Sequence, residues 1–255
     1  MKWNNTHLHD LANAKEAARL SELVYSLGDD GNGYDILWRD DKTDTEAYGW
    51  SSDDQIVICF RGTSSAADAK TDLKFHKVPF SIADSGDTGA FSISDIKRTN
   101  QGNVHRGFLS AVGSVWREIR SWLKEIWKCN KPLFVCGHSL GAANACVLAA
   151  RLSLDFIPVK AVYTFGCPRV GDRKFSRLFN EQVRHYRYVN NNDVVTRLPP
   201  FATHTGFRYY FNRRGERVVI GWWAEKWDRL MGRMFQSVVD GVNDHKMSNY
   251  IANMK

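Results

Sequence analysis

Five consecutive residues, Gly137-His138-Ser139-Leu140-Gly141, constrain the fold of this chain more than any other stretch. The apolar run Leu133–Cys136 before them predicts a short strand. The segment Ala142–Leu152 after them is rich in Ala and Leu, contains no Gly or Pro, and predicts a helix. A G-x-S-x-G sequence between a strand and a helix is typical of a sharp turn whose small residues let the two elements pass closely. Such a turn exposes the serine hydroxyl beside the N–H groups of the helix start, which attract any anion that forms there. The pattern therefore predicts that Ser139 is a nucleophile.

Strands and helices alternate along the rest of the sequence. Apolar spacing predicts helices within residues 8–26, 108–126 and 223–238, and a short helix at 244–251. Strands are expected at 55–60, 159–165 and 183–189, and hairpins at 34–50 and 207–220. Alternation of this kind favours a mostly parallel central sheet flanked by helices, so the expected fold class is α/β. A chain of 255 residues suits a single domain of this class, residues 1–255.

A long polar stretch, residues 64–103, interrupts this alternation without a clear period. Long excursions inside a compact domain usually serve a function. We therefore expect a lid or cap region around residues 64–103.

Composition narrows the class of protein. The formal net charge is +7, but the basic residues are scattered among Asp and Glu, which favours a solvated basic surface over nucleic-acid binding. The first residues are polar, without the apolar core of a signal peptide, and no stretch has the length of a transmembrane helix. The five cysteines lack C-x₂-C spacing, so we expect buried free thiols, no metal site and a reducing compartment. The expected location is cytoplasmic, or secreted without a conventional signal peptide.

A serine hydroxyl is a weak nucleophile at neutral pH and needs an adjacent base, usually an imidazole held by a carboxylate. With this elbow, the three residues follow the order Ser, Asp or Glu, His. Asp193 fits the carboxylate, because it directly follows a predicted strand and strand ends gather at one edge of the sheet. Its rival, Asp172, precedes a helix and is expected to cap it. His204 and His245 both follow Asp193, and order alone leaves the choice between them open.

Two further histidines have structural interpretations. His138 adjoins Ser139, but neighbouring residues on a sharp turn face apart, so His138 is not expected to be the base. His105 precedes a predicted helix and is expected to be a structural hydrogen-bonding group.

Five motifs occur in a fixed order along the chain. They are Phe60-Arg61-Gly62-Thr63, Val104-His105-Arg106-Gly107-Phe108, Gly137-His138-Ser139-Leu140-Gly141, Phe165-Gly166-Cys167-Pro168-Arg169-Val170-Gly171, and Asn192-Asp193 with Leu198-Pro199-Pro200. This set resembles the class 3 lipase family, the fungal-lipase-like branch of the α/β-hydrolases. The resemblance runs from about residue 8 to the C-terminus. It implies the α/β-hydrolase fold, in agreement with the alternating strands and helices.

The resemblance also implies roles for single residues. In that family, the histidine that matches His204 is usually structural, and the C-terminal histidine that matches His245 is the base. The family forms its oxyanion hole from the residue that matches Thr63, by its backbone N–H with its hydroxyl as a second donor, and from the backbone N–H that matches Leu140. The implied reaction is acyl transfer, in which Ser139 attacks an ester carbonyl and Asp193 orients His245. The implied enzyme is a carboxylic ester hydrolase, similar to triacylglycerol lipases, that cleaves acyl glycerol esters without a cofactor.

Two alternatives stay open at this stage. The chain could be a phospholipase A1, because a basic surface favours anionic headgroups. It could instead be a non-catalytic hydrolase-fold protein that binds partners, although every triad and oxyanion position is filled.

The sequence departs from the family pattern in two segments. The expected lid start, residues 64–73, contains no aromatic residue, which puts activation at a lipid interface in doubt. Residues 222–235 are aromatic and Met-rich, and could line an acyl pocket, form another cap or make transient contact with a lipid interface. A helix packed on the core is the more ordinary interpretation of the same spacing. The disulfides of secreted relatives are also expected to be absent.

Overall fold

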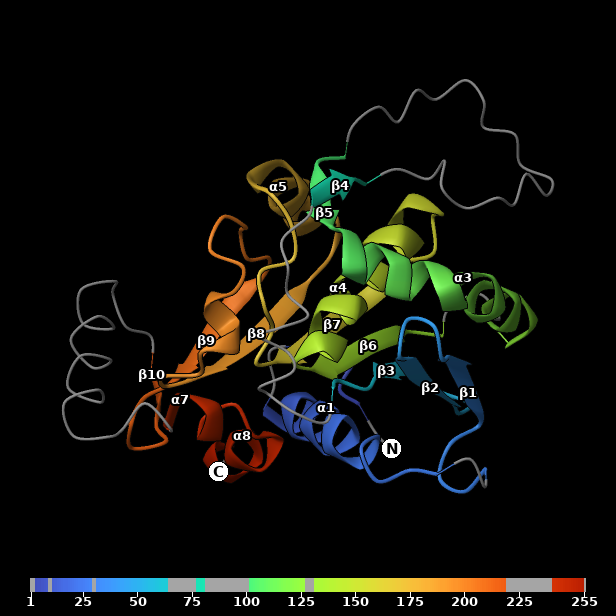
Figure 1. The fold of residues 1–255 in the computed structure, drawn as a ribbon. Helices are drawn as coiled ribbons and strands as arrows, with labels where there is room; N and C mark the ends of the chain where they lie inside the picture. The colour runs from blue at the N-terminus through green and yellow to red at the C-terminus, as the bar shows by residue number, and fades with distance from the viewer. Residues whose placement is uncertain are drawn as a thin grey trace.

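The computed structural model describes residues 3–8, 11–28, 31–63, 77–80, 101–126, 131–218 and 240–254. Within these ranges, the centre of the fold is an eight-stranded sheet with the order β1-β2-β3-β6-β7-β8-β9-β10 (Figure 1). Its strands are β1 (Ile36–Asp40), β2 (Thr45–Ser51), β3 (Ile56–Phe60), β6 (Leu133–His138), β7 (Val159–Phe165), β8 (His185–Asn190), β9 (Phe207–Phe211) and β10 (Arg217–Val218). Strands β3, β6, β7, β8 and β9 run parallel, and the outer pairs are antiparallel. The mostly parallel α/β sheet predicted from the sequence is confirmed.

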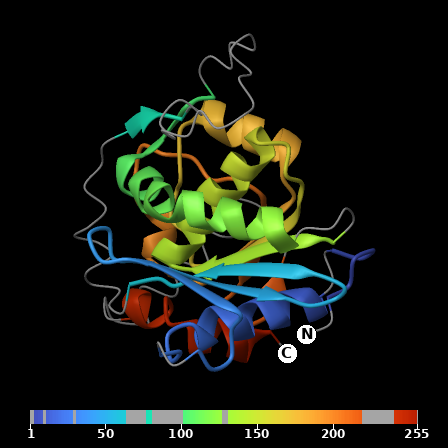
Figure 2. The ribbon, with the colours of Figure 1, turned by 90° about the vertical axis from the view of Figure 1, so that its right-hand side faces the viewer.

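Helices cover both faces of the sheet. They are α1 (Leu11–Leu23), α3 (Arg106–Ile126), α4 (Leu140–Leu154), α5 (Arg173–Gln182), α7 (Asp240–Asn243) and α8 (Met247–Asn253), with a short 3₁₀ helix η2 at Val195–Arg197. Figures 1 and 2 show α3, α4 and α5 on one side of the sheet and α1 and α8 on the other. Alternate residues of strand β3 pack on opposite faces of the sheet. Ile58 packs in the core under α3 and α4, and Cys59 packs in the core under α1. Burial on both faces explains why residues 55–60 lack a polar alternation.

Two features differ from the sequence-based expectations. The tail helix predicted at 244–251 is present as α8 but begins at Met247, after a turn that separates it from α7. A small antiparallel pair, β4 (Lys77–Pro79) and β5 (Asn103–His105), was not predicted. Strand β10 is the described part of the second arm of the predicted hairpin, of which residues 219 and 220 lie outside the described residues.

The expected lid at 64–103 falls mostly outside the described residues, which include only 77–80 and 101–103 of it. The aromatic segment 222–235 lies wholly outside them. None of the helices within the described ranges has the length and apolarity needed to cross a bilayer. Four cysteines in these ranges, Cys59, Cys136, Cys146 and Cys167, are buried free thiols.

Candidate active site

Ser139 stands at the junction of β6 and α4, as the G-x-S-x-G pattern predicts. Its φ of 57° and ψ of −126° lie in a region that costs a non-glycine residue about 1–3 kcal/mol. A Cβ on Gly137 would lie 2.5 Å from the Gly141 carbonyl oxygen, and a Cβ on Gly141 would lie 2.7 Å from the Arg61 oxygen. The two glycines are therefore required by close backbone approach, and the strand can turn directly into the helix.

Ser139, His245 and Asp193 form a continuous hydrogen-bonded chain. The Ser139 Oγ lies 2.7 Å from Nε2 of His245, and Nδ1 of His245 lies 2.8 Å from Oδ2 of Asp193. An ionised carboxylate can only accept, so Nδ1 carries the proton and Nε2 is left to accept from the serine hydroxyl. All three side chains are buried. The structure thus brings together the three residues predicted as nucleophile, carboxylate and base.

The turn after β8 holds the His245 segment in place. The side-chain amide of Asn190 donates to the carbonyl of Asp244 at 2.9 Å. The Asn191 side-chain amide and the Asn192 backbone N–H both donate to Oδ2 of Asp244, each at 3.1 Å. These bonds join the sequence neighbour of His245 to the turn that carries Asp193. They also explain why the predicted tail helix begins only at Met247 and not at Asp244.

The Asp193 carboxylate is stabilised in its charged form. Burial raises its pKa, but the adjacent His245 and hydrogen bonds from His245 and Tyr250 outweigh burial, so that the pKa lies below its usual value. Its second oxygen, Oδ1, accepts the backbone N–H of Val195 at 2.9 Å. A carboxylate held ionised in this way can orient an imidazole and stabilise the imidazolium.

The two predicted oxyanion donors lie beside the serine. Leu140 is the first residue of α4, so its N–H has no acceptor within the helix. Thr63 follows the end of β3, and its Oγ1 is buried without a hydrogen-bond partner in the described part of the chain. A Cβ on the preceding Gly62 would lie 3.1 Å from Cβ of Ser139, which shows how closely this segment passes the elbow.

The other candidates take structural positions. Asp172 caps α5, accepting the Phe175 N–H at 2.9 Å, as expected. Burial, followed by the charge of Arg187, lowers the pKa of His204 well below the usual value. His105 accepts the Gly107 N–H at 3.2 Å.

His138 was expected to face away from Ser139, and it lies against the base, His245. Its ring centroid is 4.6 Å from that of His245. Its Nε2 lies 2.7 Å from the backbone oxygen of His245, and its Nδ1 lies 2.9 Å from the Tyr25 hydroxyl. With both ring nitrogens engaged, His138 has no free atom with which to accept a proton from Ser139.

Two residues of the site were missed by sequence reasoning. The Tyr250 hydroxyl donates to Oδ2 of Asp193 at 2.6 Å, and Gly166 packs against both His245 and Asp193. The Phe165–Gly171 motif drew attention to Gly166 without a role. Tyr250 gave no signal beyond an aromatic residue in an apolar tail.

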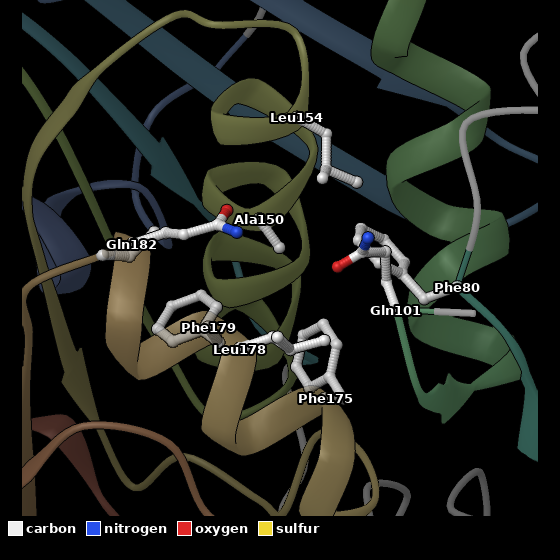
Figure 3. Close-up of a pocket in the computed structure, with 9 residues that line it drawn as sticks. Phe80, Gln101, Ala150, Leu154, Phe175, Leu178, Phe179 and Gln182 are labelled. Atoms are coloured by element: carbon white, nitrogen blue, oxygen red, sulfur yellow. The ribbon is translucent and has the colours of Figure 1, made fainter. Parts of the chain in front are cut away.

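An apolar pocket lies between α4, α5 and the segments around Phe80 and Gln101 (Figure 3). Ala150 and Phe179 are in its wall. Ala150 lies eleven residues along α4 from Ser139, which at 1.5 Å per residue is about 16 Å. The wall that Ala150 forms is therefore distant from the elbow. A polar pocket lined by Asp44, Glu46, Arg61, Gly62 and Thr63 adjoins the elbow instead.

Comparison with known proteins gives one family. Residues 57–203 match the family described as "Lipase (class 3)". The secreted mono- and diacylglycerol lipase 1 of Fusarium solani is 39% identical over 119 residues, covering 43% of this chain and 34% of that protein. The chloroplastic phospholipase A(1) DAD1 of Arabidopsis thaliana is 35% identical over 156 residues, covering 56% of this chain and 33% of that protein. The chain thus spans about a third of the length of these two relatives.

Among solved structures, the triacylglyceride lipase of Rhizomucor miehei superposes with a TM-score of 0.61 and 25% identity, covering 82% of each chain. The mono- and diacylglycerol lipase of Aspergillus oryzae superposes with a TM-score of 0.62 and 25% identity, covering 80% of each chain.

Proposed function

The chain belongs to the class 3 lipase family, and from this premise we propose that it is a serine carboxylic ester hydrolase that cleaves acyl glycerol esters. The observation that carries the proposal is the hydrogen-bonded chain from Ser139 through His245 to Asp193. A serine on a strained elbow, with its hydroxyl on an imidazole that a buried carboxylate holds, is the arrangement that activates serine for acyl transfer.

In the proposed reaction, Ser139 Oγ attacks the ester carbonyl while His245 Nε2 takes its proton. The negative oxygen that forms accepts hydrogen bonds from the backbone N–H groups of Thr63 and Leu140 and from the Thr63 hydroxyl. Loss of one such donor typically costs about 3 kcal/mol of transition-state stabilisation. His245 then gives the proton to the leaving alcohol, and Asp193 stabilises the imidazolium meanwhile. Water, activated by His245, hydrolyses the acyl-enzyme and frees Ser139.

Phospholipase A1 activity is the second candidate. The net charge of +7 favours approach to anionic headgroups, and one relative bears that activity in its name. Acyl glycerols remain the first proposal, because relatives named as acylglycerol lipases occur both in the sequence comparison and among the superposable structures.

A fluorophosphonate probe tests the enzyme proposal. Wild type should be labelled and the Ser139→Ala variant should not. An unlabelled wild type, or equal labelling of both, contradicts hydrolase activity and favours a non-catalytic binding protein. A substrate panel of short and long p-nitrophenyl esters, a triacylglycerol emulsion and a phospholipid then separates the two activities. Cleavage of the phospholipid alone would replace the acyl glycerol assignment.

Three further expectations, on domain extent, contact with lipid and location, belong to the same proposal. We propose one domain over residues 1–255, with a lid or cap around 64–103, since the described strands form one main sheet. Transient contact with a lipid interface follows from the substrate class. For location, the buried thiols favour a reducing compartment, whereas the Fusarium solani relative is named as secreted, so we retain both a cytoplasmic location and secretion.

A further inference from the structure

His138, which is buried, and Tyr25, which is partly buried, form a hydrogen-bonded pair directly behind the proposed base. Tyr25 comes from the segment after α1, and His138 is the last residue of β6. The Tyr25 hydroxyl and Nδ1 of His138 are 2.9 Å apart, and the two rings meet edge to face with centroids at 5.9 Å. No step of the proposed reaction uses either side chain, so their contacts need a separate explanation.

The partners of His138 fix its protonation. Its Nε2 faces the carbonyl oxygen of His245, which can only accept, so Nε2 carries a proton. Burial, followed by the charge of His245, lowers the pKa of His138 to about 3, so the ring is neutral at physiological pH. A neutral ring with a proton on Nε2 has an acceptor at Nδ1, and the Tyr25 hydroxyl must therefore be the donor.

The Tyr25 hydroxyl also lies against Gly62, the residue before the proposed oxyanion donor Thr63, because a Cβ added at Gly62 would overlap this hydroxyl. The two hydrogen bonds run in one direction, from Tyr25 to His138 and from His138 to the His245 carbonyl, and their first donor touches Gly62. The other tautomer of His138 would leave the His245 carbonyl facing a lone pair.

We propose that Tyr25 and His138 are positioning residues whose hydrogen-bond chain fixes the backbone of His245 relative to the oxyanion segment at Gly62. The proposal rests on the proposed function, since this spacing affects turnover only if Ser139 and His245 react. Ser139 lies between the two ends of the chain, so the pair sets the distance between base and oxyanion donors from behind the elbow. The His138 ring, whose centroid lies 4.6 Å from that of the His245 ring at an interplanar angle of 32°, limits movement of the base.

Point variants separate positioning from packing. Tyr25→Phe removes one hydroxyl and keeps the ring. His138→Leu removes both polar atoms, and His138→Gln restores a side-chain N–H donor for the His245 carbonyl. Tyr163→Phe is the matched control, because its hydroxyl is buried and bonded to the carbonyl of Leu8, away from the elbow. Hydrolysis of p-nitrophenyl butyrate gives kcat and KM, and thermal melting reports the folded fraction.

Misplacement of a catalytic group by about 1 Å can cost about 100-fold in rate. We expect kcat to fall about tenfold in Tyr25→Phe and about 100-fold in His138→Leu, with KM within about twofold of wild type and with His138→Gln regaining about tenfold. Tyr25→Phe should add less than about twofold in the His138→Leu background, because residues of one chain are not additive. Tyr163→Phe should keep the wild-type kcat.

Each result supports or overturns the proposal. If the wild type is active and Tyr25→Phe has the same kcat, the positioning proposal is overturned while the proposed function stands. A loss in Tyr163→Phe equal to that in Tyr25→Phe, or no recovery in His138→Gln, shows that the effect is general packing, and also overturns it. If His138→Leu does not fold, Tyr25→Phe and His138→Gln decide. A wild type without labelling or ester hydrolysis overturns the proposed function, and this proposal with it.

Discussion

Tyr250 donates its hydroxyl to Oδ2 of Asp193, the same oxygen that accepts the Nδ1 proton of His245. The same hydroxyl accepts the backbone N–H of Asn190 at 3.0 Å. One carboxylate oxygen therefore carries two donors, and the second comes from α8, only five residues beyond the histidine that it assists. This arrangement stabilises the charged form of Asp193 in a fully buried position.

The first prediction concerns Tyr250→Phe. Hydrogen bonds to charged groups contribute about 1.5–3 kcal/mol, so we expect kcat to fall about tenfold or more. Asp193 has a lowered pKa in the folded chain, so its contribution to stability is present above its usual pKa and is lost as pH falls through the folded value. Without Tyr250 the folded value rises, and acid unfolding monitored by circular dichroism should begin at a higher pH. An unchanged acid transition would contradict this role.

The second prediction concerns Gly166→Ala. Gly166 has a φ of 61°, and a Cβ there would lie 2.8 Å from Cε1 of His245 and 2.9 Å from Oδ2 of Asp193. The methyl group must displace the base or the carboxylate, so we expect kcat to fall about 100-fold. Gly31→Ala is the control for strain alone, because Gly31 has a φ of 74° and open space around it. Steady-state kinetics of both variants decides: equal losses would mean that strain alone is responsible.

The third prediction concerns Thr63→Val, which replaces the hydroxyl by a methyl group of similar size. The Thr63 Oγ1 is buried without a partner in the described part of the chain, so its loss should leave the free energy of unfolding unchanged or slightly higher. If the hydroxyl serves the oxyanion, kcat should fall about 10- to 100-fold, while Thr63→Ser keeps most of the activity. Urea unfolding and kcat measured on the same samples test both parts. A Val variant with full activity would leave only the backbone N–H as donor.

The fourth prediction concerns pH and His185, a buried residue outside the active site. Its Nε2 is 2.7 Å from Oγ1 of Thr164 and its Nδ1 is 2.9 Å from Oγ1 of Thr205. Burial, then the charge of Arg187, lowers its pKa to about 3. In the unfolded chain this histidine takes up a proton near its usual pKa of about 6.5, whereas in the folded chain it stays neutral down to its lowered pKa. The free energy of unfolding therefore decreases as pH falls from about 6.5 towards the folded pKa, by up to about 1.4 kcal/mol per pH unit.

Urea unfolding between pH 7 and pH 5 measures this slope. The His185→Gln variant should show a mean slope that is lower by about 1 kcal/mol per pH unit over this range, whatever its stability at pH 7, because the unfolded histidine is only partly protonated near pH 7. An equal slope in wild type and variant would show that His185 is protonated in the folded chain.

Local patterns account for part of this structure. The elbow was predictable because the patterns of a strand, two glycines and a helix all occur within residues 133–152. Asp193 was predictable from its place at a strand end. Physics alone did not choose between His204 and His245, because the choice depends on the Asn190–Asn192 turn, which binds Asp244 from more than fifty residues away.

The remaining features depend on packing between distant segments. The contact between Tyr25 and His138 spans 113 residues, and no spacing in the sequence indicates it. The three-residue strands β4 and β5 are too short for an apolar alternation to identify them. Resemblance to a family indicated the role of His245. The contacts of Tyr250 and Gly166 with the site are visible only in the three-dimensional structure.

The fifth prediction concerns Phe156, at the C-terminal end of α4. The N–H of Phe156 donates to the Ser153 carbonyl and that of Ile157 to the Leu152 carbonyl, the two bonds of a Schellman motif. Phe156 occupies the left-handed position of this motif, with a φ of 60°, where glycine is preferred, and its side chain is 67% exposed. Phe156→Gly should therefore raise the free energy of unfolding by about 1 kcal/mol, measured by urea unfolding. Phe156→Ala removes the ring but keeps the strained Cβ, so it should not stabilise. If both variants stabilise equally, the exposed ring, and not the backbone, is the source of the cost.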